Sequence, residues 1–155
     1  MRLLLVVAAL AILPLGTGRL EGQAPPRLDN PPSIHAPRGY SHVAVVPAGN
    51  TMVFIAGQVA LDREGRLVGA NDLRAQTVQV FENLRLALES AGATFKDVIK
   101  LNYYVLDAGQ IAVVREVRDQ YLNRAAPPAS TLVEVRRLFR DDVLIEVEAV
   151  AVTRP

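Results

Sequence analysis

The stretch VLIEVEAVAV, residues 143–152, decides the fold because its two faces differ in chemical character. Successive side chains of a strand point to opposite faces of a sheet. One face of this segment is wholly apolar and consists of Ile145, Val147, Ala149 and Ala151. The other face carries Leu144, Glu146, Glu148, Val150 and Val152. Because buried carboxylates need partners, the segment predicts a strand with helices over one face and a mixed contact on the other.

Four further segments have strand character. Residues 42–46 and 51–59 are apolar runs on either side of a Gly-Asn turn, which predicts a hairpin. Residues 97–107 alternate between apolar and polar side chains. In the segment PPASTLVEV, residues 127–135, two prolines stop the preceding element and a strand begins near Ser130.

Two segments have helical periodicity. Apolar residues recur at spacings of three and four between Thr77 and Leu88, which predicts a helix over residues 72–91. A second helix is predicted over 109–123. The element order is therefore β-β-α-β-α-β-β, an α+β fold whose helices can cover only one face of the sheet.

The face of the sheet that no helix is predicted to cover carries both large apolar side chains and polar or charged ones. Its apolar members include Leu132, Leu144, Val150 and Tyr104, whereas Lys100, Asn102 and the glutamates are polar. We therefore expect this face to pack on another subunit, with polar residues lining clefts between subunits. The alternative is a monomer whose half-hydrated sheet carries scattered apolar residues.

The N-terminal residues divide into two parts before the domain. Residues 1–24 have the charge and short apolar run of a signal peptide, which predicts a periplasmic or secreted protein. An uncleaved anchor is the alternative. Residues 25–38 are rich in proline and are predicted to form an extended tether, so the domain is expected to span 39–155. After signal cleavage no membrane association is expected.

Composition excludes several classes of site. The 155 residues carry a net charge of +1 and few aromatic residues, which gives no basis for nucleic-acid binding. There is no cysteine, so thiol catalysis and disulfides are excluded. With only two histidines, a histidine-based metal centre is not expected either.

Several motifs resemble those of one family. They are GYSHVAVV near the start of the domain, Gly57-Gln58 at a strand end, Phe81-x-Asn83-Leu84 on the first helix, and the final Glu-x-Glu-Ala. Together they resemble the Rid family, the YjgF-like reactive intermediate imine deaminases. The resemblance implies a chorismate-mutase-like fold and a homotrimer with a central barrel. It also implies small-molecule clefts between subunits, hydrolysis of imines or enamines to a keto acid and ammonia, and no cofactor or metal.

The resemblance also implies a set of site residues. Glu146 matches the glutamate that places the water or moves the proton. Gly57 and Gln58 match the substrate-supporting strand end. Tyr40 matches the pocket tyrosine, with His42 as the alternative, and Arg115 stands where the family has an asparagine.

The family's substrate-anchoring arginine is missing. Active members have it after Pro-x or Pro-Ala, where this chain reads Pro128-Ala129-Ser130-Thr131. Ser130 cannot supply a charge or a bidentate fork, so Ser130 and Thr131 are predicted to form a small polar pocket floor. Arg115 is a possible substitute for the lost cation.

Two functions remain open, an imine or enamine deaminase and a non-catalytic trimer that binds a small metabolite. The older endoribonuclease label of the family is disfavoured by the charge.

Overall fold

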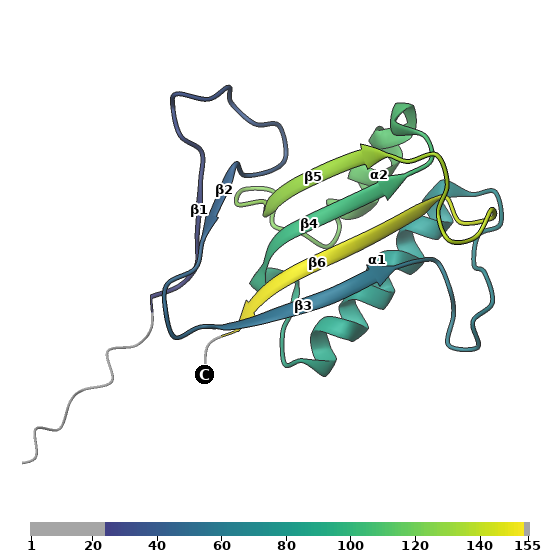
Figure 1. Cartoon of the computed structure of the whole chain (residues 1–155), viewed down its shortest axis with the longest axis horizontal. Coiled ribbons are helices and arrows are strands. Elements are labelled where there is room, and N and C mark those ends of the chain that lie inside the picture. Colours follow the sequence, from purple (N-terminus) through teal and green to yellow (C-terminus); the bar gives the residue numbers. More distant parts are fainter. Residues whose placement is uncertain (1–23, 154–155) are drawn as a thin grey trace, which may run out of the picture.

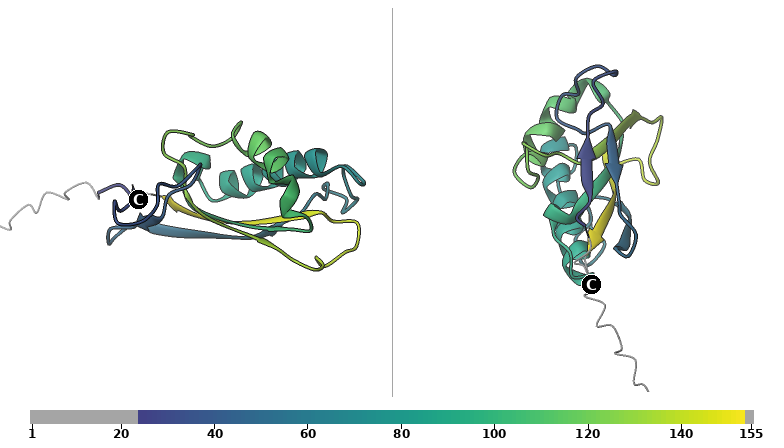
Figure 2. Two further views of the ribbon diagram at one scale, coloured as in Figure 1. Left: turned by 90° about the horizontal axis from the view of Figure 1, so that it is seen from above. Right: turned by 90° about the vertical axis from the view of Figure 1, so that its left-hand side faces the viewer.

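The computed structural model describes residues 24–153. A four-stranded sheet in the order β3-β6-β4-β5 forms one layer, and helices α1 and α2 form the other (Figures 1 and 2). The predicted signal peptide, apart from Ala24, lies outside the described residues. Within 24–153, none of the helices has the length and apolar character that crossing a membrane requires.

The sheet combines antiparallel and parallel pairing. Strands β3 (Thr51–Gln58) and β4 (Val98–Val105) both run antiparallel to the central strand β6 (Ile145–Thr153). Strand β5 (Ala129–Glu134) runs parallel to β4. A parallel pair needs a crossover connection, and α2 (Ile111–Arg118) supplies it. The α+β architecture predicted from the sequence is confirmed.

The helices follow the predicted periodicity with one difference in length. Helix α1 (Leu73–Ser90) begins where the Asp72 carboxylate accepts a hydrogen bond from the Ala75 amide at 3.0 Å. A short 3₁₀ helix (Phe95–Asp97) precedes β4. The second helical segment is shorter than the predicted 109–123, because a 3₁₀ turn (Ala108–Gln110) leads into α2 and the α-helix ends at Arg118.

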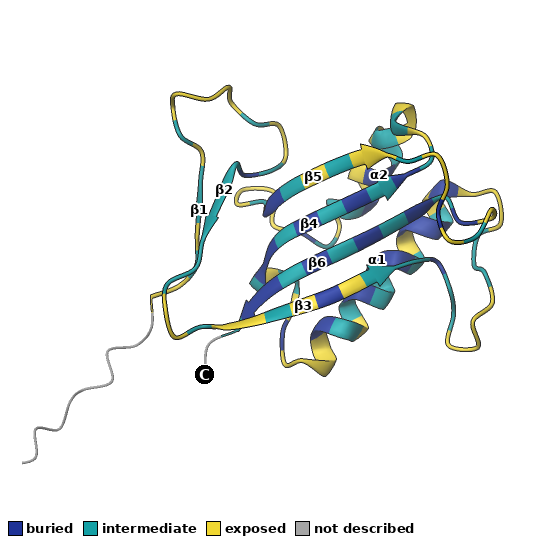
Figure 3. Ribbon diagram, viewed as in Figure 1, coloured by how far each residue is buried: buried dark blue, intermediate teal, exposed yellow. Residues whose placement is uncertain are grey.

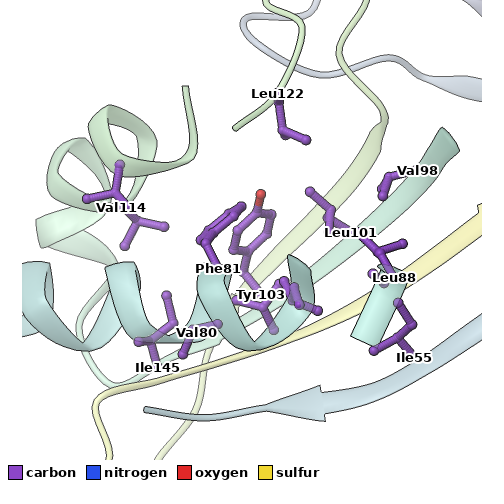
Figure 4. Close-up of a cluster of buried hydrophobic side chains, with 14 of the residues drawn as sticks. Ile55, Val80, Phe81, Leu88, Val98, Leu101, Tyr103, Val114, Leu122 and Ile145 are labelled. Carbon is purple, nitrogen blue, oxygen red and sulfur yellow. The ribbon is translucent and has the colours of Figure 1, made fainter. Parts of the chain in front are cut away.

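The core fills the space between the sheet and the helices. Figure 4 shows Phe81 and Leu88 of α1 against Leu101, Tyr103 and Ile145 of the sheet. The predicted apolar face of β6 is buried as expected. Buried and more exposed positions alternate along the strands (Figure 3), because successive residues face the helices and the other, uncovered side of the sheet in turn. Phe54 lies there with 75% of its surface exposed.

A buried glutamine anchors the start of β6. The Gln76 side-chain amide donates to the carbonyls of Gly69 and Asp142, and its oxygen accepts from the Leu144 amide at 2.8 Å. Its own burial is complete, so these three bonds satisfy a polar group that would otherwise destabilise the fold. They fix the chain immediately before Glu146.

The predicted hairpin between 42–46 and 51–59 is wrong. Strand β2 (Val43–Val45) pairs instead with β1 (Arg27–Asp29) in a separate two-stranded ribbon. Strand β1 lies inside the proline-rich segment that was expected to be a simple tether. A turn motif favours reversal of the chain, but the choice of partner strand depends on contacts distant in sequence.

Ser41 ties this ribbon to the sheet. Its amide donates to the Pro128 carbonyl at 3.1 Å, and its hydroxyl donates to the Pro127 carbonyl at 2.7 Å. The contact brings the segment before Ser41 beside the start of β5.

Strand β5 also departs from the expected facing. Leu132 was assigned to the helix-free face, but it pairs with Tyr103 and packs against the helix-side core. Leu144 packs against the same core. The apolar side chains available to the helix-free face are therefore fewer than predicted.

Candidate functional site

A cavity of about 350 Å³ lies between β5, α2 and the segment preceding Ser41. Ser130 lies in register with Leu101 on the helix side of the sheet, and this position brings it to the cavity. Tyr40 and Arg115 line the same cavity. The remaining lining residues are Arg38, Gly39, Tyr103, Ala108, Ile111, Val114, Arg118 and Leu132. Three predicted site residues, Tyr40, Arg115 and Ser130, are thus brought together.

The cavity is positively charged. Its lining contains three arginines and no acidic residue. Arg118 is already engaged, because its guanidinium bonds Asp119 at 2.6 Å and the Gly39 carbonyl at 3.1 Å. Among the described residues, Arg38 and Arg115 have neither an ion-pair partner nor a side-chain hydrogen bond. The cavity therefore offers two unpaired guanidinium groups to an anionic ligand.

Tyr40, rather than His42, is the residue at the cavity. Its hydroxyl lies 3.0 Å from Nε2 of His35, and its ring meets that of His42 edge-on. The His42 ring nitrogen Nε2 donates to the His35 carbonyl at 2.8 Å. The two histidines therefore hold the tyrosine in place at the end of the ribbon.

Tyr103 contributes a buried phenol behind the cavity. Burial raises the pKa of its hydroxyl far above the ordinary value, so the group stays protonated. The positive charge of nearby Arg118 lowers the pKa, but its effect is smaller than that of burial. Among the described residues, none forms a hydrogen bond with the Tyr103 hydroxyl. Tyr103 forms part of the cavity wall as a neutral group.

Glu146 lies on the other face of the sheet, against Gly57. A Cβ built on Gly57 would come within 1.8 Å of the Glu146 carboxylate oxygen. A β-bulge between Ile55 and Gln58 interrupts the pairing of β3 with β6 at this point. Bulges redirect neighbouring side chains and are common beside functional sites.

Burial raises the pKa of Glu146, and the neighbouring Glu148 raises it further. Glu148 itself accepts hydrogen bonds from Asn102 at 3.2 Å and from the Tyr104 hydroxyl at 3.1 Å. Glu146 thus retains a proton at a higher pH than an ordinary glutamate, which suits a group that exchanges protons.

A shallow hollow of about 330 Å³ beside Glu146 is also lined by Tyr104 and Arg137. The Arg137 side chain is 72% exposed and pairs loosely with Asp141 at 3.8 Å. It is nonetheless a cation that lines the same hollow as Glu146.

Two predicted residues lie outside both of these places. Thr131 projects from β5 to the helix-free face, where its hydroxyl accepts from the Lys100 ammonium at 2.6 Å. Gln58 lies at the β3 edge beside α1 and donates to the Ala56 carbonyl at 3.0 Å. Ser130 and Thr131 do not form one pocket floor, because adjacent strand residues face opposite ways.

Five of the predicted site residues therefore form two groups on opposite faces of one sheet. Tyr40, Arg115 and Ser130 line the helix-side cavity, whereas Gly57 and Glu146 lie against each other on the helix-free side. Within a single chain the sheet separates them. Among residues 24–153, no cluster of three or more histidine, aspartate or glutamate side chains could hold a metal ion.

The family model described as Endoribonuclease L-PSP matches residues 31–153. The chain belongs to the Rid family. A Rid family protein from Yersinia pestis has a similar structure, with a TM-score of 0.73 at 36% identity, covering 83% of this chain and 98% of that one. A RutC family protein of Pyrococcus abyssi is 41% identical over 106 residues, 68% of this chain and 81% of its own length.

A relative in Salmonella typhimurium is named 2-iminobutanoate/2-iminopropanoate deaminase. It is 37% identical over 106 residues, which cover 67% of this chain and 81% of that protein. Membership of the Rid family confirms the fold and the resemblance inferred from the sequence.

Two cavity arginines of this Rid protein were missed by sequence reasoning. Arg118 lies three residues after Arg115, a spacing that places both on one side of a helix, so the pattern could have revealed it. Arg38 was assigned to the tether, because the boundary was placed just after it. Arg38 lies two residues before Tyr40, the predicted pocket tyrosine, and this closeness in sequence could have indicated that it lines the cavity.

Proposed function

We propose that this Rid protein hydrolyses a small anionic imine or enamine to a keto acid and ammonia. The observation that carries the proposal is the cavity, where unpaired Arg115 lies with Tyr40 and Ser130. In this proposal Arg115 holds the substrate carboxylate in place of the arginine that Ser130 replaces. The cation that binds the carboxylate is therefore on helix α2 in this chain, instead of on strand β5 as the family resemblance implies.

We further propose a homotrimer in which the cavity of one subunit meets Glu146 of the next. Water adds to the imine carbon and the C=N electron pair moves to nitrogen. Glu146 takes a proton from the water and delivers it to the nitrogen. The hydroxyl group of the resulting carbinolamine then gives its proton to the nitrogen as the C–N bond breaks, so that ammonia leaves and the carbonyl forms. Gly57 leaves the space in which the carboxylate of Glu146 lies.

The experiment is ammonia release from enzymatically generated 2-iminopropanoate by the purified protein. Turnover well above buffer is expected, with loss in Arg115→Asn and in Glu146→Gln. Arg136→Gln is the matched control, because Arg136 is exposed and does not line the cavity. Inert wild-type protein on this and other imines would contradict the proposal.

The second candidate is a non-catalytic trimer that binds a small metabolite. Ser130 at the arginine position favours it, because a serine cannot supply the bidentate fork. Ligand-induced thermal stabilisation without turnover would distinguish it from the deaminase.

We also propose export of the protein to the periplasm or medium. The apolar run after Arg2 supports this, and N-terminal sequencing of the protein from its host tests it. A mature chain starting near Pro25 is expected, and a retained Met1 in the cytosol would contradict export.

A further inference from the structure

We infer that the ligand of the helix-side cavity is a dianion, specifically a 2-imino acid whose side chain carries a second acidic group. The inference rests on the proposed deaminase function for the imine, but its charge requirement comes from the cavity alone. A monocarboxylate would satisfy only one of the two unpaired arginines.

The two arginines come from different walls. Arg115 projects from α2, and Arg38 comes from the segment that Ser41 holds beside β5. Arg118, the third arginine, is already engaged by Asp119 at 2.6 Å, which Arg124 also contacts at 3.3 Å, and by the Gly39 carbonyl. Two cations of the lining therefore have no ion-pair partner among the described residues, and they lie on separate sides of one cavity.

Arg38 and Arg115 are both exposed residues in the single chain, where their charges are accessible to water. A ligand and a second subunit that cover the cavity would remove this water, and the Glu146 of that subunit is engaged with the attacking water in the proposed mechanism rather than with the arginines. An uncompensated charge is costly once it is desolvated, whereas a carboxylate in bidentate contact offsets the loss. A second acidic group on the ligand fits this requirement.

The rest of the cavity agrees with an extended ligand. Ser130 leaves open the floor that an arginine side chain would fill, and the volume is about 350 Å³. Apolar side chains of Ala108, Ile111, Val114 and Leu132 line the space between the polar groups. They provide contact for a short carbon skeleton that carries an acidic group at each end.

The test compares two imines of equal carbon number, 2-iminosuccinate and 2-iminobutanoate, each generated in the assay by a coupled enzyme. The second carboxylate of the first replaces the terminal methyl group of the other. We expect kcat/KM to favour 2-iminosuccinate by about tenfold or more, the size of one charge-assisted hydrogen bond. Arg38→Gln should remove this preference, and Arg136→Gln should retain it.

A binding measurement that involves no turnover separates the dianion inference from the deaminase proposal. Succinate should raise Tm more than butanoate does, and Arg38→Gln should abolish the difference. If both imines are hydrolysed with no preference and the two acids stabilise equally, the dianion inference is wrong and the deaminase stands. If neither imine reacts but succinate alone stabilises, the deaminase fails and the dianion inference stands. If neither imine reacts and the two acids stabilise equally, both are overturned.

Discussion

The carboxylate of Glu146 occupies the space that a side chain on residue 57 would need. A Cβ on Gly57 would lie 1.8 Å from one carboxylate oxygen and 2.7 Å from the carboxylate carbon. Only glycine lets β3 approach β6 this closely beside the bulge. The relationship explains in physical terms why residue 57 is a glycine beside Glu146 in this chain.

Gly57→Ala should therefore displace Glu146 and lower kcat by at least about tenfold, since a small misplacement of a proton-transferring group is enough for such a loss. Ammonia release measures the effect. Gly65→Ala is the control, because it adds a methyl at φ 76° with nothing within 4 Å. It should cost some stability and leave kcat unchanged. Equal activity in both variants would show that the glycine does not position Glu146.

The raised pKa of Glu146 gives a pH prediction. The folded state holds this proton more tightly than the unfolded chain, whose value is about 4.5. The contribution of this tighter proton binding to the free energy of unfolding is fully present below pH 4.5 and is lost as the pH rises through the higher pKa of the folded state. At pH 7 to 8 Glu146→Gln should thus be at least as stable as wild type in urea denaturation, while ammonia release is lost. A large destabilisation at that pH would contradict this.

The relocated charge predicts a rescue. Arg115→Asn should lower kcat/KM for 2-iminopropanoate by roughly ten- to a hundredfold, from loss of a charge-assisted contact. Adding Ser130→Arg to this variant should restore most of the activity, because the double change returns the cation to the strand. A double variant as inactive as Arg115→Asn would argue that Arg115 does not anchor the substrate.

The proposed assembly predicts the effect of Phe54. This side chain is 75% exposed on the helix-free face, next to Lys100 and Glu148. Light scattering should give three times the chain mass for wild type and a smaller species for Phe54→Asp. Val78→Asp, which lies on α1 with 39% of its surface exposed, is the matched control and should remain trimeric. A monomeric wild type would contradict the assembly.

The sequence predicted the layers better than it predicted the pairing. The faces of β6 and the extent of α1 follow from local periodicity, so both were found. The partner of β2 was missed, because Val43–Val45 could pair with either neighbour and the choice depends on β1, a segment that reads as a tether.

The site was predicted only in part, again because contacts between segments distant in sequence decide which residues lie together. Arg115 and Ser130 meet because β5 runs parallel to β4 beside α2, and helical spacing alone cannot show this. Thr131 was grouped with Ser130 by proximity in sequence, although strand alternation places it on the other face. Arg38 reaches the cavity through the Ser41 contact with Pro127 and Pro128, which has no local signature.

The most direct test of the shared site mixes two impaired variants, Arg115→Asn and Glu146→Gln, in equal amounts in one refolded or co-expressed sample. If each site takes its cavity from one subunit and its glutamate from the next, random mixed trimers should regain activity. About a quarter of the interfaces would combine an intact Arg115 with an intact Glu146, so about a quarter of wild-type activity is expected. Activity no higher than the sum of the separate variants, in samples shown to contain mixed trimers, would contradict a site built from two chains.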